Sequence, residues 1–355
     1  MSDPSVAGGT LPATTWKEVI PDGEPARLEA LAAQLHQLQK RRAGKGPVAR
    51  GLHAKGKAGV LAELTVLPDL PAYARVGLFA TPATFRAYVR FSNGSGTRER
   101  DTKPDVRGVA IKVLGVPGAK IIPGLEKATT QDFLLIRSPA GPFRNADEFI
   151  WFVCAAARPA LLLPRALVHF GPVRAIRLIR QLVAGLKQPM ASVATTRYYS
   201  ALPIQFGRFA AKYALAPHAA PEPAPAGKRP PRSPDYLAEE LAARLSRGPV
   251  SYYLRAQFYV DDERTPIEDP TREWLEQDAP FVTLARLTLP RQDLGAPRGQ
   301  KVASFIESLS FDPWHTTADF RPLGNMMRAR NAAYRMSGQE RGAAPEPDGS
   351  EQFEG

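Results

Sequence analysis

The sequence is poor in the residues from which disulfides and cysteine-based sites are built. Of its 355 residues one is cysteine and five are histidine. The single Cys154 excludes a disulfide within the chain and fits a reducing compartment. The first fifteen residues have neither a cationic start nor an apolar run, so we predict no signal peptide and a cytoplasmic protein. The apolar region 149–182 is broken by arginine and proline, and it lacks the roughly 20 consecutive apolar residues of a membrane span.

The charge is unbalanced, with 47 lysines and arginines against 35 acidic residues and a formal net charge of +12. The basic residues are scattered and form no recognised nucleic-acid module, so we predict no nucleic-acid partner. Arg174, Arg177 and Arg180 recur every third residue among apolar ones. Such a helix can lie on a bilayer, which leaves weak, peripheral membrane association open. A helix that faces the core and has a solvated cationic edge is the simpler explanation.

Hydrophobic periodicity predicts a mixed α+β chain. Leucines three and four residues apart predict a helix over Glu24–Arg42, and the apolar stretch Asn145–Gln188 is also predicted to be helical. The predicted strands are Leu61–Leu67, Arg86–Phe91, Val106–Leu114, Phe133–Ile136, Tyr198–Phe206, Tyr252–Val260 and Phe281–Leu289. We expect one domain over residues 24–341, a flexible lead-in over 1–23, and a disordered polar tail over 342–355.

Near the carboxyl end, Met326–Tyr334 contains no helix breaker and is predicted to be helical. Arg330 and Tyr334 are four residues apart and therefore share a helix face. An adjacent guanidinium together with a ferric ion would favour the phenolate form of this tyrosine, which is a known type of haem ligand. Taken alone, the pair is more simply explained by an exposed arginine beside a half-buried tyrosine.

Near the amino end, His53 precedes a glycine-containing run and the alternating segment Glu63–Leu67, which is typical of a strand. A histidine at the entrance of a strand is more often structural than catalytic. The sequence around it, Arg50-Gly51-Leu52-His53-Ala54-Lys55-Gly56, nevertheless resembles the distal-histidine signature of haem catalases.

Further segments carry the same resemblance, and they follow in the order found in that family. Val89–Ser92 and Asp101–Lys112 resemble the next catalase blocks, and Arg330-x-x-x-Tyr334 resembles the proximal-tyrosine signature. Phe281–Leu287 and Leu309–Trp314 resemble the segments that lead into the tyrosine helix. The chain is most similar to the short catalase-related haem peroxidases of bacteria. This resemblance implies an α+β fold with a catalase-type antiparallel β-barrel and surrounding α-helices.

The resemblance also implies a cofactor, ferric haem b, and a role for each matching residue. Tyr334 would be the axial ligand of the haem iron, with Arg330 as its partner. His53 would be the distal base, and Ser92 would hydrogen-bond its other ring nitrogen. The residues that would contact the porphyrin are Arg50, Arg90 and Arg341, which match the propionate-binding arginines, and Phe143 on the distal face. Asp105 matches an acidic residue of the access channel, and a structural cap is an equally good explanation.

Two positions bear on the reaction. The position of the distal asparagine of catalases is taken by Thr130, with Gln131 next to it, and the sequence leaves open which of them replaces the asparagine. This departure implies weak catalase activity. Leu52 resembles the apolar residue of ordinary catalases, whereas allene oxide synthases of the family tend to carry threonine there.

The implied function is a haem-dependent peroxidase of the oxidative stress response. It would reduce organic hydroperoxides and hydrogen peroxide through a ferryl intermediate, with a small electron donor as the second substrate. Three alternatives stay open: a fatty-acid hydroperoxide-rearranging enzyme of the allene oxide synthase or hydroperoxide lyase type, a non-catalytic haem-binding sensor or carrier, and a membrane-surface protein. A homodimer is also left open.

Overall fold

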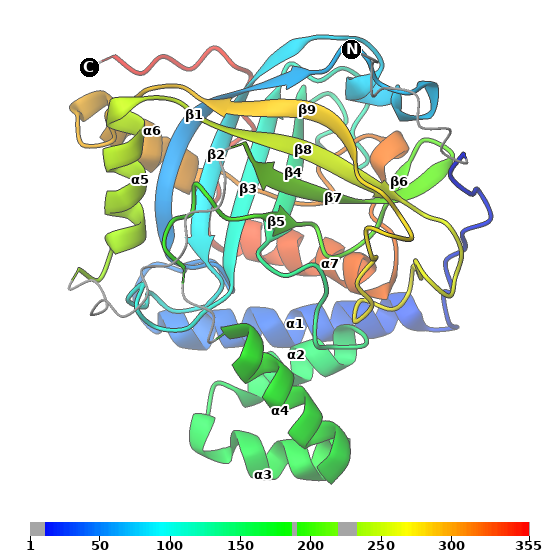
Figure 1. Ribbon diagram of the computed structural model, residues 1–355. Coiled ribbons are helices and arrows are strands. Elements are labelled where there is room, and N and C mark those ends of the chain that lie inside the picture. Colours follow the sequence, from blue (N-terminus) through cyan, green and yellow to red (C-terminus); the bar gives the residue numbers. More distant parts are fainter. Residues whose placement is uncertain (1–10, 187–189, 219–232, 355) are drawn as a thin grey trace.

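The computed structural model describes residues 11–186, 190–218 and 233–354. In these residues nine antiparallel strands follow the order β5-β4-β3-β2-β1-β9-β8-β7-β6, and a further pairing of β5 with β7 closes eight of them into a barrel (Figure 1). The strands are β1 (Gly56–Val66), β2 (Thr84–Asn93), β3 (Arg107–Leu114), β4 (Thr130–Ile136), β5 (Tyr198–Tyr199), β6 (Ile204–Phe206), β7 (Phe209–Pro217), β8 (Val250–Phe258) and β9 (Val282–Leu289). The predicted α+β fold with an antiparallel barrel is confirmed.

Helices cover one end and one side of the barrel. Those in the described residues are α1 (Glu24–Ala43), α2 (Ala146–Ala155), α3 (Pro159–Phe170), α4 (Pro172–Leu186), α5 (Tyr236–Arg247), α6 (Pro297–Ser308) and α7 (Asn325–Glu340). In Figure 1, α1, α2 and α7 lie side by side below the strands, while α5 and α6 flank β1. Helices α3 and α4 project below this layer, away from the barrel. None of the helices in the described part is long and apolar enough to cross a membrane.

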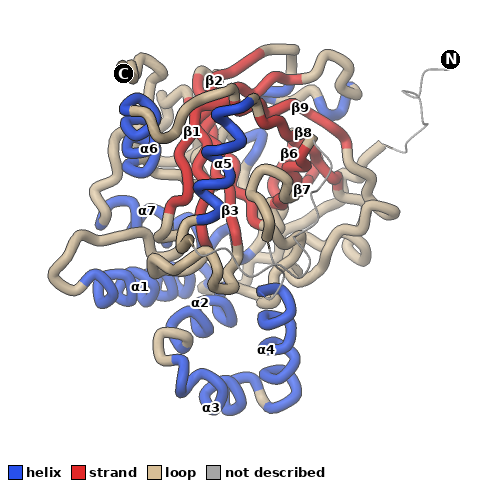
Figure 2. Tube along the Cα trace, turned by 60° about the vertical axis from the view of Figure 1, so that its left-hand side comes forward, coloured by secondary structure: helices blue, strands red, loops and turns tan. Residues whose placement is uncertain are grey.

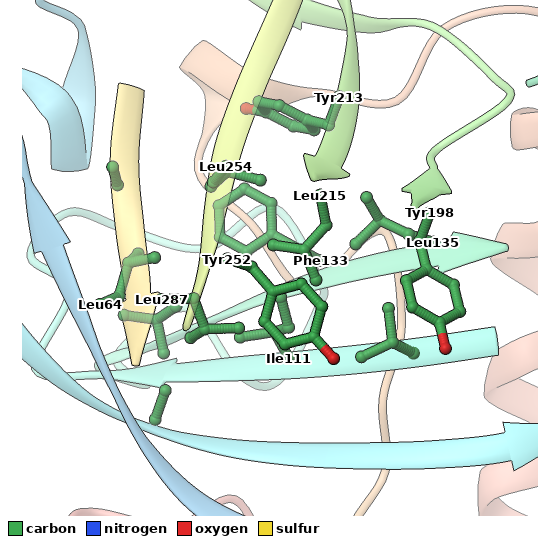
Figure 3. Close-up of a cluster of buried hydrophobic side chains, with 14 of the residues drawn as sticks. Leu64, Ile111, Phe133, Leu135, Tyr198, Tyr213, Leu215, Tyr252, Leu254 and Leu287 are labelled. Carbon is green, nitrogen blue, oxygen red and sulfur yellow. The ribbon is translucent and has the colours of Figure 1, made fainter. Parts of the chain in front are cut away.

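The interior of the barrel is filled by alternate side chains of its strands. Leu64, Ile111, Phe133 and Leu254 come from four different strands and are all buried in one cluster (Figure 3). Since successive strand residues point to opposite faces, this alternation sets which residues face the core and which face the helices. The barrel is therefore a packed core, and the space for a ligand lies at its end, beneath the helices.

The predicted elements differ from the observed ones in several places, and α5 and α6 were not among the predicted helices. The segment expected as one strand over Tyr198–Phe206 is divided into β5 and β6, and β7 was not predicted at all. The helical region 145–188 is three helices in the described residues. Each of α3 and α4 begins with proline, which suits the first position of a helix. Gly171 between them has φ +73°, a left-handed conformation that glycine adopts without strain.

Both ends of the described chain are attached to the body of the protein. Glu18 pairs with Arg328 at 2.6 Å, and Glu346 of the tail pairs with the buried Lys112 at 2.7 Å. Tyr88 Oη also donates to Glu351 at 2.8 Å. Carboxylates of the segments expected as a flexible lead-in and a disordered tail thus pair with cations of the folded body. Residues 1–10 and 355 lie outside the described part.

Candidate active site

A cavity of about 460 Å³ lies between the barrel end and the helix layer. Its wall is mostly apolar and comes from β2, β3, β4 and the helices α1, α2 and α7. Ten of the twelve residues singled out from the sequence line it: Arg50, Leu52, His53, Arg90, Ser92, Asp105, Phe143, Arg330, Tyr334 and Arg341. Residues that are up to 291 positions apart in the chain are therefore brought together around one space.

His53 is held in an unusual conformation just before β1. Its φ is +55°, in the left-handed region that residues with a side chain seldom adopt. Its backbone N–H donates to the carbonyl of Gly94 at 3.0 Å. Its ring nitrogen Nδ1 lies 2.9 Å from Ser92 Oγ, and the ring lies so near Gly108 that a Cβ there would be 2.7 Å from its Cε1. Backbone strain at a residue fixed on several sides is typical of functional sites.

The imidazole of His53 is uncharged at neutral pH. Burial lowers the pKa of His53 to about 3, and the positive charges of Arg90, Arg330 and Arg50 lower it in the same direction. Since Ser92 binds Nδ1, the other nitrogen Nε2 is left for a substrate. A neutral imidazole with one free nitrogen can accept a proton and return it.

Three arginines and one glutamate form a charged cluster at the edge of the cavity. Glu307 of α6 binds Arg50 at 2.5 Å and Arg90 at 2.8 Å. Arg341 donates to the carbonyls of Ser308 and Leu309 at 3.1 and 2.9 Å. Burial, with the adjacent guanidiniums of Arg90 and Arg341, lowers the pKa of Arg50 to about 9, so it stays protonated at neutral pH. The cluster of these residues thus holds two more positive than negative charges.

Tyr334 faces the same cavity from α7, one helical turn after Arg330. Arg330 Nη2 donates to the Tyr334 oxygen at 2.8 Å, and the guanidinium lies 5.1 Å from the centre of the ring. This hydrogen bond fixes the Tyr334 oxygen at the cavity wall. Phe143 adds an aromatic wall and packs edge-on against Phe149, with ring centres 5.4 Å apart.

The structure does not bring Thr130 to the cavity. The register of β3 and β4 places Thr130 opposite Leu114, whereas Gly108, which contacts His53, is opposite Ile136. Six residues of strand separate the two positions, roughly 20 Å. Thr130 instead lies 2.6 Å from His315 Nε2 and donates to Glu346 at 2.9 Å. Gln131 is buried and does not line the cavity either, and no asparagine lines it among the described residues.

Comparison with known proteins decides the family. No family model matches the chain. The catalase-related peroxidase of Mycolicibacterium paratuberculosis (strain ATCC BAA-968 / K-10) is 31% identical over 326 residues, which cover 86% of this chain and 94% of that protein. The chain belongs to the catalase-related peroxidases.

Solved structures of full-length catalases share the fold. A fungal catalase matches with a TM-score of 0.63 and 18% identity, and catalase A from Saccharomyces cerevisiae with 0.64 and 15%. Both matches cover 95% of this chain, which spans 66% and 68% of the two catalases. This catalase-related peroxidase therefore retains the barrel and the helix layer within about two thirds of a catalase chain.

The residues of the site fit the haem that catalase-related peroxidases are expected to bind. The surplus of two positive charges on Arg50, Arg90, Arg341 and Glu307 equals the charge of two propionates. The phenol of Tyr334 and the imidazole of His53 both line the apolar cavity. Two participants were missed by sequence reasoning: Glu307 and Gly108. No local pattern distinguishes Glu307 from any other glutamate on an amphipathic helix. For Gly108 the only signal in the sequence is that a glycine stands near the start of a strand.

Proposed function

We propose that this protein is a haem-dependent peroxidase. It reduces organic hydroperoxides and hydrogen peroxide with electrons from a small donor, and its catalase activity is weak. The observation that carries the proposal is the neutral His53, held by Ser92 and Gly108, in a cavity that is also lined by the Arg330–Tyr334 pair. An oxidoreductase that acts on peroxide needs such a base beside its redox group.

The protein residues divide the work as follows. Tyr334 would hold haem b through its oxygen, to which Arg330 donates, and Arg50, Arg90 and Arg341 would bind the propionates. When bound, the haem supplies the redox chemistry by which a peroxide bond is cleaved. His53 Nε2 accepts the proton from the hydroperoxide and delivers it to the oxygen that leaves. Ser92 keeps the ring oriented for both transfers.

The absence of an asparagine from the described cavity wall supports weak dismutation of hydrogen peroxide. Thr130 binds His315 and Glu346, and Gln131 does not line the cavity, so neither donates to a peroxide beside His53. Peroxidase turnover, in which an electron donor supplies the electrons, does not depend on a second hydrogen-bonding side chain beside His53. We therefore expect peroxidase turnover to exceed oxygen release from hydrogen peroxide.

The proposed function is tested with variants in which a side chain of the cavity is replaced by one of similar size. We expect His53→Gln to lose at least 100-fold in peroxidase kcat with an organic hydroperoxide while its haem content stays that of wild type. Tyr334→Phe should take up less haem and change the ferric absorption spectrum. Full activity in His53→Gln would refute the proposal.

A second candidate is the rearrangement of fatty-acid hydroperoxides without an external reductant. The apolar wall of the cavity, with Phe149, Ile150 and Val153 of α2, favours a substrate with an acyl chain. A lipid hydroperoxide incubated with and without a donor separates the two reactions. A peroxidase gives the alcohol only with the donor, whereas a rearranging enzyme consumes the substrate equally well without it.

A further inference from the structure

The projecting hairpin of α3 and α4 carries an unusual concentration of exposed apolar side chains. Of the eleven large hydrophobic residues exposed in the described part of the chain, six lie in these two helices. They are Leu161, Leu163, Val168, Val173, Ile176 and Val183, and Val168 and Val173 are 89% and 71% exposed. Figures 1 and 2 both show the hairpin standing away from the barrel, so the other described residues do not cover this surface. Exposed apolar groups gathered in one place mark a contact surface.

The charge of the hairpin has one sign. Between Glu148 and Glu222 the sequence contains no aspartate or glutamate. Arg165 of α3 and Arg177 and Arg180 of α4 are exposed among the apolar residues, and Arg158 precedes α3. A helix face that contacts only water normally carries both positive and negative side chains. A face of apolar and basic residues alone is instead complementary to an apolar layer with an anionic surface.

We propose that the α3–α4 hairpin docks this protein on the surface of an anionic phospholipid membrane. The exposed leucines, valines and isoleucine would enter the boundary between headgroups and acyl chains, and the arginines would bind lipid phosphates. An open groove between α2 and α3, lined by Trp151, Leu161 and Val168, adds apolar surface next to the docked face. A second copy of the chain fits this surface less well, because two such faces would bring arginines against arginines.

The docked face is continuous with the candidate active site. Val153 of α2 and Leu182 of α4 line the catalytic cavity, while Trp151 of α2 and Val183 of α4 belong to the outer surface of the same helices. Docking would therefore place the cavity beside the membrane, where lipid hydroperoxides form. This consequence for the substrate rests on the proposed peroxidase function, whereas the docking itself does not.

Co-sedimentation of the full-length protein with vesicles tests the docking and needs no turnover. We expect binding to vesicles of phosphatidylglycerol and phosphatidylcholine, weaker binding in high salt, and little binding to phosphatidylcholine alone. One arginine near such a surface contributes about a fivefold gain in affinity. Replacement by Arg177→Glu/Arg180→Glu should therefore lower the affinity by at least about 30-fold.

Two further variants keep the test specific. Arg247→Glu/Arg298→Glu changes the net charge equally, but on α5 and α6, and should lower the affinity much less. Val173→Ser/Ile176→Ser leaves the charge unchanged and should weaken binding about tenfold, because less apolar surface is buried. Equal binding by the hairpin variants and wild type would overturn the proposal. It would also be overturned by wild-type protein that stays in solution, or by a dimer that the hairpin variants dissociate.

Discussion

Gly108 and His53 lie so close together that the glycine has no room for a side chain. A Cβ atom placed on Gly108 would stand 2.7 Å from His53 Cε1 and 3.0 Å from Nδ1. Gly108 of β3 thus limits the position of the imidazole, while Ser92 of β2 holds its Nδ1. Because His53 has an unfavourable positive φ, these neighbours rather than its own backbone preference fix the ring.

The first prediction follows from this contact. Gly108→Ala should lower the peroxidase kcat by about 10- to 100-fold, since a displacement of about 1 Å of a catalytic group can cost 100-fold in rate. Steady-state kinetics with an organic hydroperoxide, at matched haem content, measures the effect. Gly248→Ala is the control, because Gly248 has an extended backbone and its added Cβ meets nothing within 4 Å. An unchanged kcat in Gly108→Ala would show that the position of the His53 ring does not limit turnover.

The second prediction concerns the hydrogen bond between Ser92 and His53. Ser92→Ala removes the partner of Nδ1 and should lower kcat about tenfold, the equivalent of one hydrogen bond of roughly 1.4 kcal/mol. Ser92→Thr retains a hydroxyl and should recover part of the loss. A role in packing alone predicts the opposite order, with the smaller alanine tolerated better than threonine.

How far the site could be predicted from the sequence depended on whether its residues stand in local motifs. His53 and the Arg330–Tyr334 pair belong to short patterns with fixed spacing, so the sequence alone predicts their roles. The prediction for Thr130 depends on its distance along the sequence from Ile136–Arg137, and this distance does not indicate which end of β4 meets the cavity. Strand β7 was missed because its alanines give little apolar alternation, although all but its last residue are buried.

The third prediction tests the balance of charge at the edge of the cavity. Arg341→Gln should weaken haem binding about tenfold, because it removes one of three cations available to two propionates. Glu307→Gln should instead strengthen it a few-fold, since the carboxylate now competes for Arg50 and Arg90. Absorbance titration of haem-free protein with haemin measures both changes, and the exposed Arg298→Gln of α6 is the control. Opposite signs for Arg341→Gln and Glu307→Gln are required, and a loss of affinity in both would contradict the charge argument.

The fourth prediction is a dependence of stability on pH. The pKa of His53 is about 3 in the folded protein and about 6.5 when the chain is unfolded, so between these values the unfolded chain binds one more proton. Stability is therefore lost as the pH falls below 6.5, by about 2 kcal/mol between pH 7 and pH 5. His53→Gln lacks this loss.

Urea unfolding of the haem-free proteins isolates the contribution of this one histidine. The free energy of unfolding of His53→Gln, minus that of wild type, should rise by about 2 kcal/mol from pH 7 to pH 5. The subtraction removes the other titrating groups, among them Asp312, whose pKa is raised by burial to about 7. A difference that is constant between the two pH values would mean that His53 ionises normally in the folded protein.

The fifth prediction concerns the carboxyl-terminal tail. Lys112 is fully buried, and its ammonium group is 2.7 Å from both Asp132 and Glu346. Glu346 also accepts from Thr130, so this residue ties the tail to β3 and β4. Removal of one partner of a buried ion pair typically costs 3–5 kcal/mol. We expect Glu346→Gln to lower the free energy of unfolding by about 3 kcal/mol.

Glu351→Gln is the matched control, since Glu351 of the same tail is only partly buried, accepts from Tyr88 and from the backbone N–H of Asp348, and should cost about 1 kcal/mol. Neither variant should change kcat by more than about twofold at a temperature where both are folded. The reason is distance, since Lys112 lies four residues along β3 from Gly108, roughly 13 Å away. A large fall in kcat for Glu346→Gln would mean that the Lys112 cluster, and with it Thr130, acts on the chemistry at His53. A stability equal to that of wild type would mean that the tail is not held by its glutamate.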